Sequence, residues 1–241
     1  MIVKTEGIVL HNTKYSENSV ICNIYTREYG KIGFLVNGVR NNKGAIKASH
    51  IQALNLVELD IYYNPSKSLQ RIKELKVSNN LQDLHTSPSK IAITFLLTEL
   101  LSKSIKEEEG NEELYRFIYL NVLEVNNSPE KELSNFPSYF TLNLASILGH
   151  NIVNDVIHNS EADSSAKGIY SSRSLNTFYF SEEEKEKIFK ILTPHYNNEI
   201  GASWNKAERV SILNKSIDYF QSVVLDNNKL KSISVIRHIM A

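Results

Sequence analysis

The sequence predicts an α+β fold, in which a small closed β-barrel is followed by a domain made of α-helices. Before residue 80, short segments rich in β-branched and aromatic residues alternate with turn signals, and no long helical pattern interrupts them. After residue 80, apolar residues recur at helical spacing, and several of these runs follow helix-capping residues. We therefore expect a barrel domain at residues 1–80 and a helical domain at residues 81–241, with an irregular segment at residues 150–180.

Five segments of the N-terminal part have the composition of β-strands. In the second of them, Val20, Cys22 and Ile24 fall on one face, because successive side chains of a strand point to opposite faces. Turn-forming residues separate the segments, as Asn37-Gly38 does after the third. The predicted strands are Thr5–His11, Ser19–Thr26, Lys31–Val36, Leu56–Tyr63 and Leu69–Val77.

Five short strands with no long helix between them suit a small closed barrel. The OB-fold is the commonest such barrel that binds single-stranded nucleic acid, and an SH3-like barrel is the structural alternative. The fold class that we expect is therefore an N-terminal five-stranded OB-fold β-barrel followed by a C-terminal α-helical domain.

Helix signals dominate the remainder of the chain. The first helix is expected to begin at Pro88, because Ser87 can cap it and proline suits the first helical position. Its apolar stripe includes Phe95, and we expect the helix to be well buried. Further helices are expected from Asn111, from about Pro137 to Gly149, from the capping box of Ser181 and Glu184, and from Lys206 to Leu225, whereas Asn159–Ser174 is polar and irregular.

Charge is distributed unevenly along a chain whose formal net charge is zero. Residues 1–80 contain 11 of the 27 Lys and Arg but only 6 of the 27 Asp and Glu, which leaves 16 and 21 for the remainder. A basic part beside an acidic part points to a localised site for a polyanion. The sequence contains no apolar run long enough to span a membrane and no apolar leader, and its single cysteine, Cys22, excludes an intramolecular disulfide. These features predict a cytoplasmic protein without a membrane partner.

Basic and aromatic residues cluster between Lys14 and Lys47, and no acidic residue occurs between Glu28 and Glu58. A twisted hairpin beside a flexible basic loop suits a nucleic-acid backbone, although an ordinary solvated hairpin is the alternative. The cations would neutralise phosphates, and the tyrosines would either stack on bases or pack in the barrel. The candidate nucleic-acid-binding residues are Lys14, Tyr15, Arg27, Tyr29, Lys31, Arg40, Lys43 and Lys47.

Catalytic and metal-binding patterns are weak. The sequence contains no glycine-rich phosphate loop, no His-Glu-x-x-His pair and no serine in a nucleophile elbow. His150 and His158, with Glu161 and Asp163 nearby, could hold a metal in a metal-dependent nuclease, but they lack a dense ligand spacing. We therefore expect neither a cofactor nor an enzymatic activity.

Several motifs together resemble one family. The motifs are Lys4-Thr5-Glu6-Gly7-Ile8-Val9-Leu10, Lys14-Tyr15-Ser16-Glu17, Tyr25-Thr26-Arg27-Glu28-Tyr29-Gly30-Lys31 and Gly38-Val39-Arg40. Their order and spacing are similar to the N-terminal signature of the bacterial DNA repair proteins RecO. Weaker likeness extends over Leu54–Leu59, Phe140–Gly149 and Leu230–Ser232, so the resemblance spans nearly the whole chain.

The resemblance implies a non-enzymatic recombination mediator with an OB-fold and a helical bundle. Such proteins bind single- and double-stranded DNA, anneal complementary strands and work with the ring protein RecR. They help to load RecA onto DNA coated by the single-stranded-DNA-binding protein SSB, and so act on RecA indirectly. They contact the acidic tail of SSB. Possible contacts for that tail are Lys206, Arg209 and Lys215. The resemblance also implies a place at the nucleoid. The alternative is an OB-fold adaptor that docks a protein partner and binds DNA only secondarily.

The chain departs from the family pattern in two places. Many members carry four cysteines for a structural zinc after the helix that matches Phe140–Gly149, but Asn151–Ser174 contains none, so the zinc site is not transferred. Asn41 and Asn42 also stand where further basic residues are common. DNA binding is therefore expected to depend more on Lys43 and Lys47.

Overall fold

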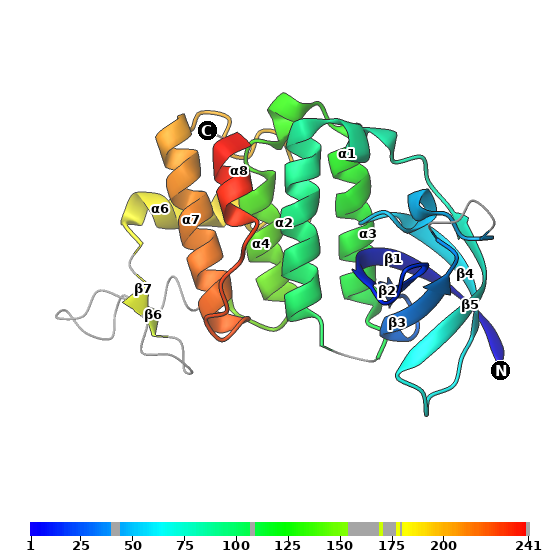
Figure 1. Cartoon of the computed structure of the whole chain (residues 1–241). Coiled ribbons are helices and arrows are strands. Elements are labelled where there is room, and N and C mark those ends of the chain that lie inside the picture. The colour runs from blue at the N-terminus through cyan, green and yellow to red at the C-terminus, as the bar shows by residue number, and fades with distance from the viewer. Residues whose placement is uncertain (40–43, 107–108, 154–168, 171–176, 179, 240–241) are drawn as a thin grey trace. The chain divides into compact units, whose positions relative to one another are not determined.

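The computed structural model describes residues 1–39, 44–106, 109–153, 169–170, 177–178 and 180–239 (Figure 1). The chain divides into two compact units. The first unit consists of Met1–Thr86 and Leu101–Asn126, and the second of Ser87–Leu100 and Asn127–Ala241. The first unit thus contains the segment expected to form the barrel domain and, in addition, one long helix. The domain boundary at residue 80 stays a prediction.

The first unit is built around a closed five-stranded barrel, drawn from blue to cyan in Figure 1. Its strands follow the order β1-β2-β3-β5-β4, with β1 paired to both β2 and β4 and with β3 and β5 parallel. This arrangement confirms the OB-fold barrel. All five predicted strands are confirmed, as β1 (Ile2–Lys14), β2 (Ser19–Thr26), β3 (Gly30–Asn37), β4 (Leu56–Tyr62) and β5 (Leu69–Val77).

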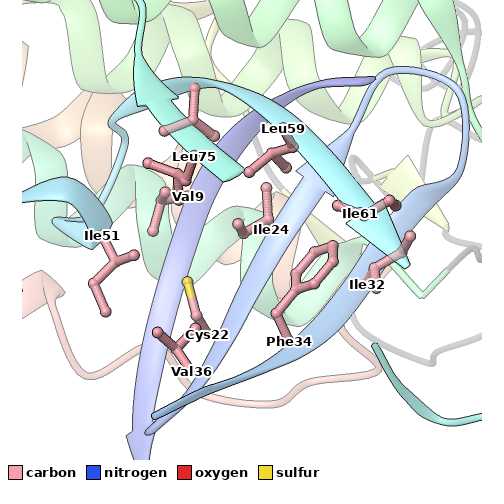
Figure 2. Close-up of a cluster of buried hydrophobic side chains, with 11 residues drawn as sticks. Val9, Cys22, Ile24, Ile32, Phe34, Val36, Ile51, Leu59, Ile61 and Leu75 are labelled. Carbon is pink, nitrogen blue, oxygen red and sulfur yellow. The ribbon is translucent and has the colours of Figure 1, made fainter. Parts of the chain in front are cut away.

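Alternating side chains of the strands fill the barrel interior (Figure 2). Cys22 and Ile24 are fully buried there, as the period-two pattern of the second strand predicts, and Phe34 of β3 is fully buried with them. Ile51, from the 3-10 helix η1 (Ala48–Ile51), belongs to the same cluster. Burial raises the pKa of the Cys22 thiol to about 12, so this residue is an unreactive part of the core.

Helices complete the first unit. They are α1 (Gln82–Thr86), the last turn of α2 (Pro88–Ser104) and α3 (Glu112–Asn127). The predicted start of α3 is confirmed, because the Asn111 side-chain oxygen accepts a hydrogen bond from the backbone N–H of Leu114 at 3.0 Å. Leu114, Ile118 and Val122 form part of its buried face.

The second unit contains the remaining helices. They are the first part of α2, η2 (Glu130–Leu133), α4 (Phe136–Ile147), α6 (Glu182–Ile191), α7 (Lys206–Val223) and α8 (Ile233–Ile239). The capping box before α6 is confirmed, because Ser181 and Glu184 exchange backbone and side-chain hydrogen bonds of 3.2 and 2.9 Å. Gly149 follows α4 with φ of +91°, which agrees with its predicted place at a helix end. Of the predicted irregular stretch Asn159–Ser174, only Ile169–Tyr170 is described, as strand β6 paired with β7 (Thr177–Phe178).

One helix prediction is wrong in detail. The apolar pattern places Phe95 in the buried stripe of α2, but its side chain is 54% exposed. The buried positions Ile93, Leu96, Leu97 and Leu100 provide the buried face of the helix, and they leave Phe95 on the other side. Within the described residues, no helix combines the length and the apolar composition that crossing a membrane requires.

Candidate nucleic-acid interface

Two loops, the one between β1 and β2 and the one that follows β3, meet at one end of the barrel. The β1–β2 loop is closed by the backbone N–H groups of Tyr15 and Ser16, which both donate to the carbonyl of Ser19. It is joined to the end of β3 because the backbone N–H of Gly38 donates to the carbonyl of Asn18 at 2.7 Å. Gly38 has φ of +73°, which explains why glycine follows Asn37 at this turn.

Three of the predicted site residues lie at this end and face solvent. Lys14 and Lys47 are exposed, and Tyr15 is 61% exposed. Asn12 ties the end of β1 to η1, which Lys47 precedes, because its side-chain amide donates to the Ile51 carbonyl at 2.7 Å. Within the described part of the chain, neither lysine forms an ion pair, so both remain available to an anion.

Arg27 lies in the β2–β3 turn, at the other end of β2, and its charge is already matched. Its guanidinium donates to Glu112 at 2.6 and 2.7 Å and to Glu6 at 2.9 Å. Its charge also lies 5.9 Å from the centre of the Tyr115 ring. These contacts raise the pKa of Arg27 above its usual value, and the hydrogen bond from Arg27 lowers the pKa of Glu112. Arg27 therefore connects the barrel to the N-terminal end of α3.

Lys31, on β3, is also engaged within the first unit. Its ammonium donates to the carbonyl oxygens of Ser102 and Ile105 at 2.7 and 2.8 Å. These carbonyls lie at the C-terminal end of α2, where a cation favours both the unpaired carbonyls and the helix dipole. Burial lowers the pKa of Lys31. The hydrogen bonds give Lys31 a capping role.

Tyr29 packs on another tyrosine of the barrel. Its ring centre lies 4.5 Å from that of Tyr63, with 38° between the ring planes. Both rings are partly buried and pack against the core cluster of the barrel. This geometry agrees with the packing alternative for Tyr29.

The predicted site therefore does not form one continuous basic rim. Tyr29 and the two engaged cations Arg27 and Lys31 lie towards one end of the β2–β3 hairpin, and the exposed trio lies towards the other. The eight residues of β2 separate these ends by about 23 Å at the usual rise of a strand. Arg40 and Lys43 lie outside the described residues, and for all eight residues DNA binding stays a prediction.

Helices cover the outer face of β1, β2 and β3. Tyr25 points outward from β2 but is fully buried, because its ring lies against Tyr115 of α3. His11 of β1 lies 3.0 Å from the Ser102 hydroxyl in the last turn of α2. The sheet face through which OB-folds commonly bind nucleic acid is thus partly occupied by the protein itself. Because Lys31 is already engaged by α2 as well, the loops are left as the candidate interface.

Gly110 allows the segment before α3 to pack closely against the barrel, although the local sequence gives little indication of this role. A Cβ atom at this position would lie 2.4 Å from the Arg27 carbonyl oxygen and 2.6 Å from the Glu28 carbonyl group. Because those neighbours are backbone atoms, only glycine lets the segment before α3 approach the β2–β3 turn so closely. In the sequence, Gly110 follows the acidic run Glu107-Glu108-Glu109, but this pattern also fits an ordinary helix end.

A second surface of the barrel carries an excess of carboxylates. A cavity of about 420 Å³ beside β1, β4 and β5 is lined by five carboxylates and only three cations. The carboxylates belong to Glu6, Glu28, Glu58, Asp60 and Glu74, and the cations to Lys4, Arg27 and Lys76. This acidic excess argues against DNA on that side and favours the end of the barrel that carries the two loops.

Candidate residues elsewhere are less informative. Lys215 bonds to Glu184, and Arg209 donates to the Trp204 carbonyl, whereas Lys206 is exposed without a described partner. The described residues contain no group of three His, Cys, Asp or Glu side chains that could hold a metal ion. Of the histidine cluster, His158 and its acidic neighbours Glu161 and Asp163 lie outside the described residues.

The barrel topology and the exposed side chains of Lys14, Tyr15 and Lys47 define an OB-fold protein with a candidate interface for a polyanion. Comparison with known families identifies the family. Residues 1–81 match the family described as "Recombination protein O N terminal", and residues 85–174 match "Recombination protein O C terminal". The chain therefore belongs to the RecO family of DNA repair proteins.

Curated relatives cover the chain from end to end. A DNA repair protein RecO of Azobacteroides pseudotrichonymphae is 27% identical over 99% of both chains. The RecO protein of Phocaeicola vulgatus is 29% identical over the whole of both chains, and that of Bacteroides fragilis is 29% identical over 99% of both. The likeness is thus not confined to the barrel.

Proposed function

We propose that this chain is a recombination mediator that binds single- and double-stranded DNA without sequence preference. Membership of the RecO family supports a role in DNA repair. The observation that carries the proposal is the exposure of Lys14, Tyr15 and Lys47 at one end of an OB-fold barrel. Contacts of this kind read the sugar–phosphate backbone and not the base sequence.

The proposed mechanism needs binding alone. Lys14 and Lys47, together with Arg40 and Lys43, would neutralise phosphates and release counterions, so affinity falls as salt rises. Tyr15 would stack on an exposed base, which is worth about 1–3 kcal/mol per base. Annealing follows because neutralised phosphates let two complementary strands approach. No bond is made or broken, so no catalytic residue and no cofactor take part.

The partners are proposed from the family. With RecR, the protein would help to load RecA onto single-stranded DNA coated by SSB. The acidic tail of SSB needs a cation that is not already paired. Among Lys206, Arg209 and Lys215, only Lys206 is exposed without a partner in the described residues, which makes it the first position to test.

A direct test measures binding of the full chain to a labelled single-stranded oligonucleotide and to the same sequence as a duplex. Fluorescence anisotropy should show binding to both forms. The logarithm of the affinity should fall linearly with the logarithm of the salt concentration. A second measurement follows annealing of two complementary strands by the decrease of donor fluorescence. Absence of binding at low salt would refute the proposal.

A protein-docking adaptor is the second candidate. The covering of the outer barrel face by α3 favours it, because this leaves a smaller surface for DNA. The charge-reversing double variant Lys14→Glu/Lys47→Glu separates the two functions. A large decrease in DNA affinity supports the mediator, whereas unchanged affinity favours the adaptor.

A further inference from the structure

A second cavity of the first unit lies beside the proposed DNA-binding loops. It measures about 550 Å³ and is formed by η1 and the residues after it, by the end of β5 and by α1. None of its eleven lining residues carries a charged side chain, and five of them carry a carboxamide. The carboxamides belong to Gln52, Asn55, Asn79, Asn80 and Gln82.

Most of these carboxamides are available to a ligand. Gln52, Asn80 and Gln82 are exposed, and Asn79 is partly exposed. Within the described part of the chain, none of these four side-chain amides makes a hydrogen bond. A carboxamide places a donor beside an acceptor, which matches the donor and acceptor pattern at the edge of a nucleobase.

The fifth carboxamide orients a histidine in the cavity wall. The Asn55 side-chain nitrogen donates to the carbonyls of Ser49 and His50 at 2.8 and 3.1 Å. The Asn55 oxygen therefore faces His85 Nε2, 3.0 Å away, and Nε2 must carry the proton. Burial lowers the pKa of His85, which favours the neutral ring. Nδ1 of His85 makes no described hydrogen bond and is left as an acceptor.

The cavity also offers apolar surface to a flat ring. Val77 lies at the end of β5 with 40% of its surface exposed, and Leu81 is buried in the same wall. Apolar side chains can contact the face of a base while polar groups bind its edge. A cavity without cations provides poor binding for a phosphate, whereas its carboxamides and apolar side chains suit a neutral, planar and polar group.

Chain continuity connects the cavity to the basic loops. Lys47 stands two residues before Ser49, which lines the cavity, and Asn12 of β1 bonds to the carbonyl of Ile51 in η1. Lys14 follows Asn12 by two residues. A single strand of DNA whose phosphates contact Lys14 and Lys47 would thus pass close to the cavity entrance.

We propose that this cavity receives one unstacked base of single-stranded DNA while the neighbouring phosphates contact Lys14 and Lys47. The inference rests on the proposed DNA-binding function and adds a base subsite to it. Such a site distinguishes single strands from duplexes, because a paired base presents neither its free edge nor its free face.

The test uses the full chain and the double variant Asn80→Ala/Gln82→Ala. Affinity is measured for a mixed-sequence single-stranded oligonucleotide and for an oligomer of equal length made of abasic sites. The wild-type protein should bind the base-bearing strand more tightly. Removal of the two amides should weaken that binding about tenfold and leave the abasic affinity unchanged. The salt slope should not change, because no charge is removed.

Matched controls make the result decisive. Asn228→Ala removes an exposed carboxamide from the second unit and should leave both affinities unchanged. Unchanged abasic affinity of the double variant also reports that the barrel is folded. Equal wild-type affinity for the two oligomers, or an equal change in both, would overturn the base subsite while leaving phosphate binding intact. Absence of binding to either oligomer would refute both proposals.

Discussion

At the scale of single residues, the cations of this barrel have different roles that their identities do not reveal. Lys14 and Lys31 are both lysines of the same barrel, yet one is exposed and the other binds the carbonyls at the end of α2. Arg27 is held by a carboxylate 85 positions away along the chain. Local sequence located the basic residues, but the partners of Arg27 and Lys31 depend on tertiary structure and could not be predicted from it.

Gly110 provides a residue-scale prediction. Gly110→Ala should lower the free energy of unfolding by about 1–3 kcal/mol, because the added Cβ would collide with the backbone of Arg27 and Glu28. Urea unfolding of the full chain measures the change. Gly33→Ala is the control, because its nearest neighbour is the end of the Leu69 side chain at 3.0 Å, which can move. A larger destabilisation in Gly33→Ala than in Gly110→Ala would contradict this account.

At the scale of elements, strands were predicted more completely than helix packing. Alternation and turn residues are local signals, and all five predicted strands were found, although β1 extends from Ile2 to Lys14, beyond the predicted Thr5–His11. Capping residues located the starts of α3 and α6 for the same reason. The orientation of α2 was predicted less well, because its apolar residues surround the helix, and the apolar pattern wrongly placed Phe95 on the buried face.

The end of α2 gives an element-scale prediction. Lys31→Met should destabilise the protein by about 1–3 kcal/mol, because the carbonyls of Ser102 and Ile105 lose their charged donor. Lys14→Met, at an exposed position of β1, should have a much smaller effect. Thermal or urea unfolding of both variants checks this. Equal stability of Lys31→Met and the wild type would refute the capping role.

The start of α3 gives a prediction on pH. The ion pair with Arg27 lowers the pKa of Glu112 below its usual 4.5. A carboxyl group whose pKa is lower in the folded state stabilises that state above its unfolded pKa, and this stabilisation disappears as the pH falls through the folded pKa. In the variant Glu112→Gln, the free energy of unfolding should therefore fall less steeply than in the wild type as the pH is lowered below about 4.5.

Glu113→Gln is the control for this pH dependence. Glu113 is exposed next to Glu112 and forms no ion pair within the described residues. Its substitution should leave the acid limb of the stability curve nearly unchanged. If Glu112→Gln and Glu113→Gln gave the same pH profile, the ion pair with Arg27 would not contribute to stability.

At the scale of the whole molecule, the charge asymmetry pointed to the part of the chain that forms the barrel. It did not show which cations of that part are available. The cations of the β2–β3 hairpin bind the helices of the first unit, which leaves Lys14 and Lys47 as the exposed cations of the described basic loops. The division into units was also beyond local sequence, because α3 joins the barrel through interactions between residues far apart in the chain.

The salt dependence of single-stranded DNA binding tests the central claim most directly. A cation that neutralises one phosphate adds about 0.7 to the magnitude of the slope of log affinity against log salt, so Lys14→Gln/Lys47→Gln should reduce this magnitude by about 1.4. Lys67→Gln, an exposed lysine of the β4–β5 loop, should leave the slope unchanged. Equal slopes for the double variant and the wild type, or a reduced slope for Lys67→Gln alone, would contradict the proposed interface.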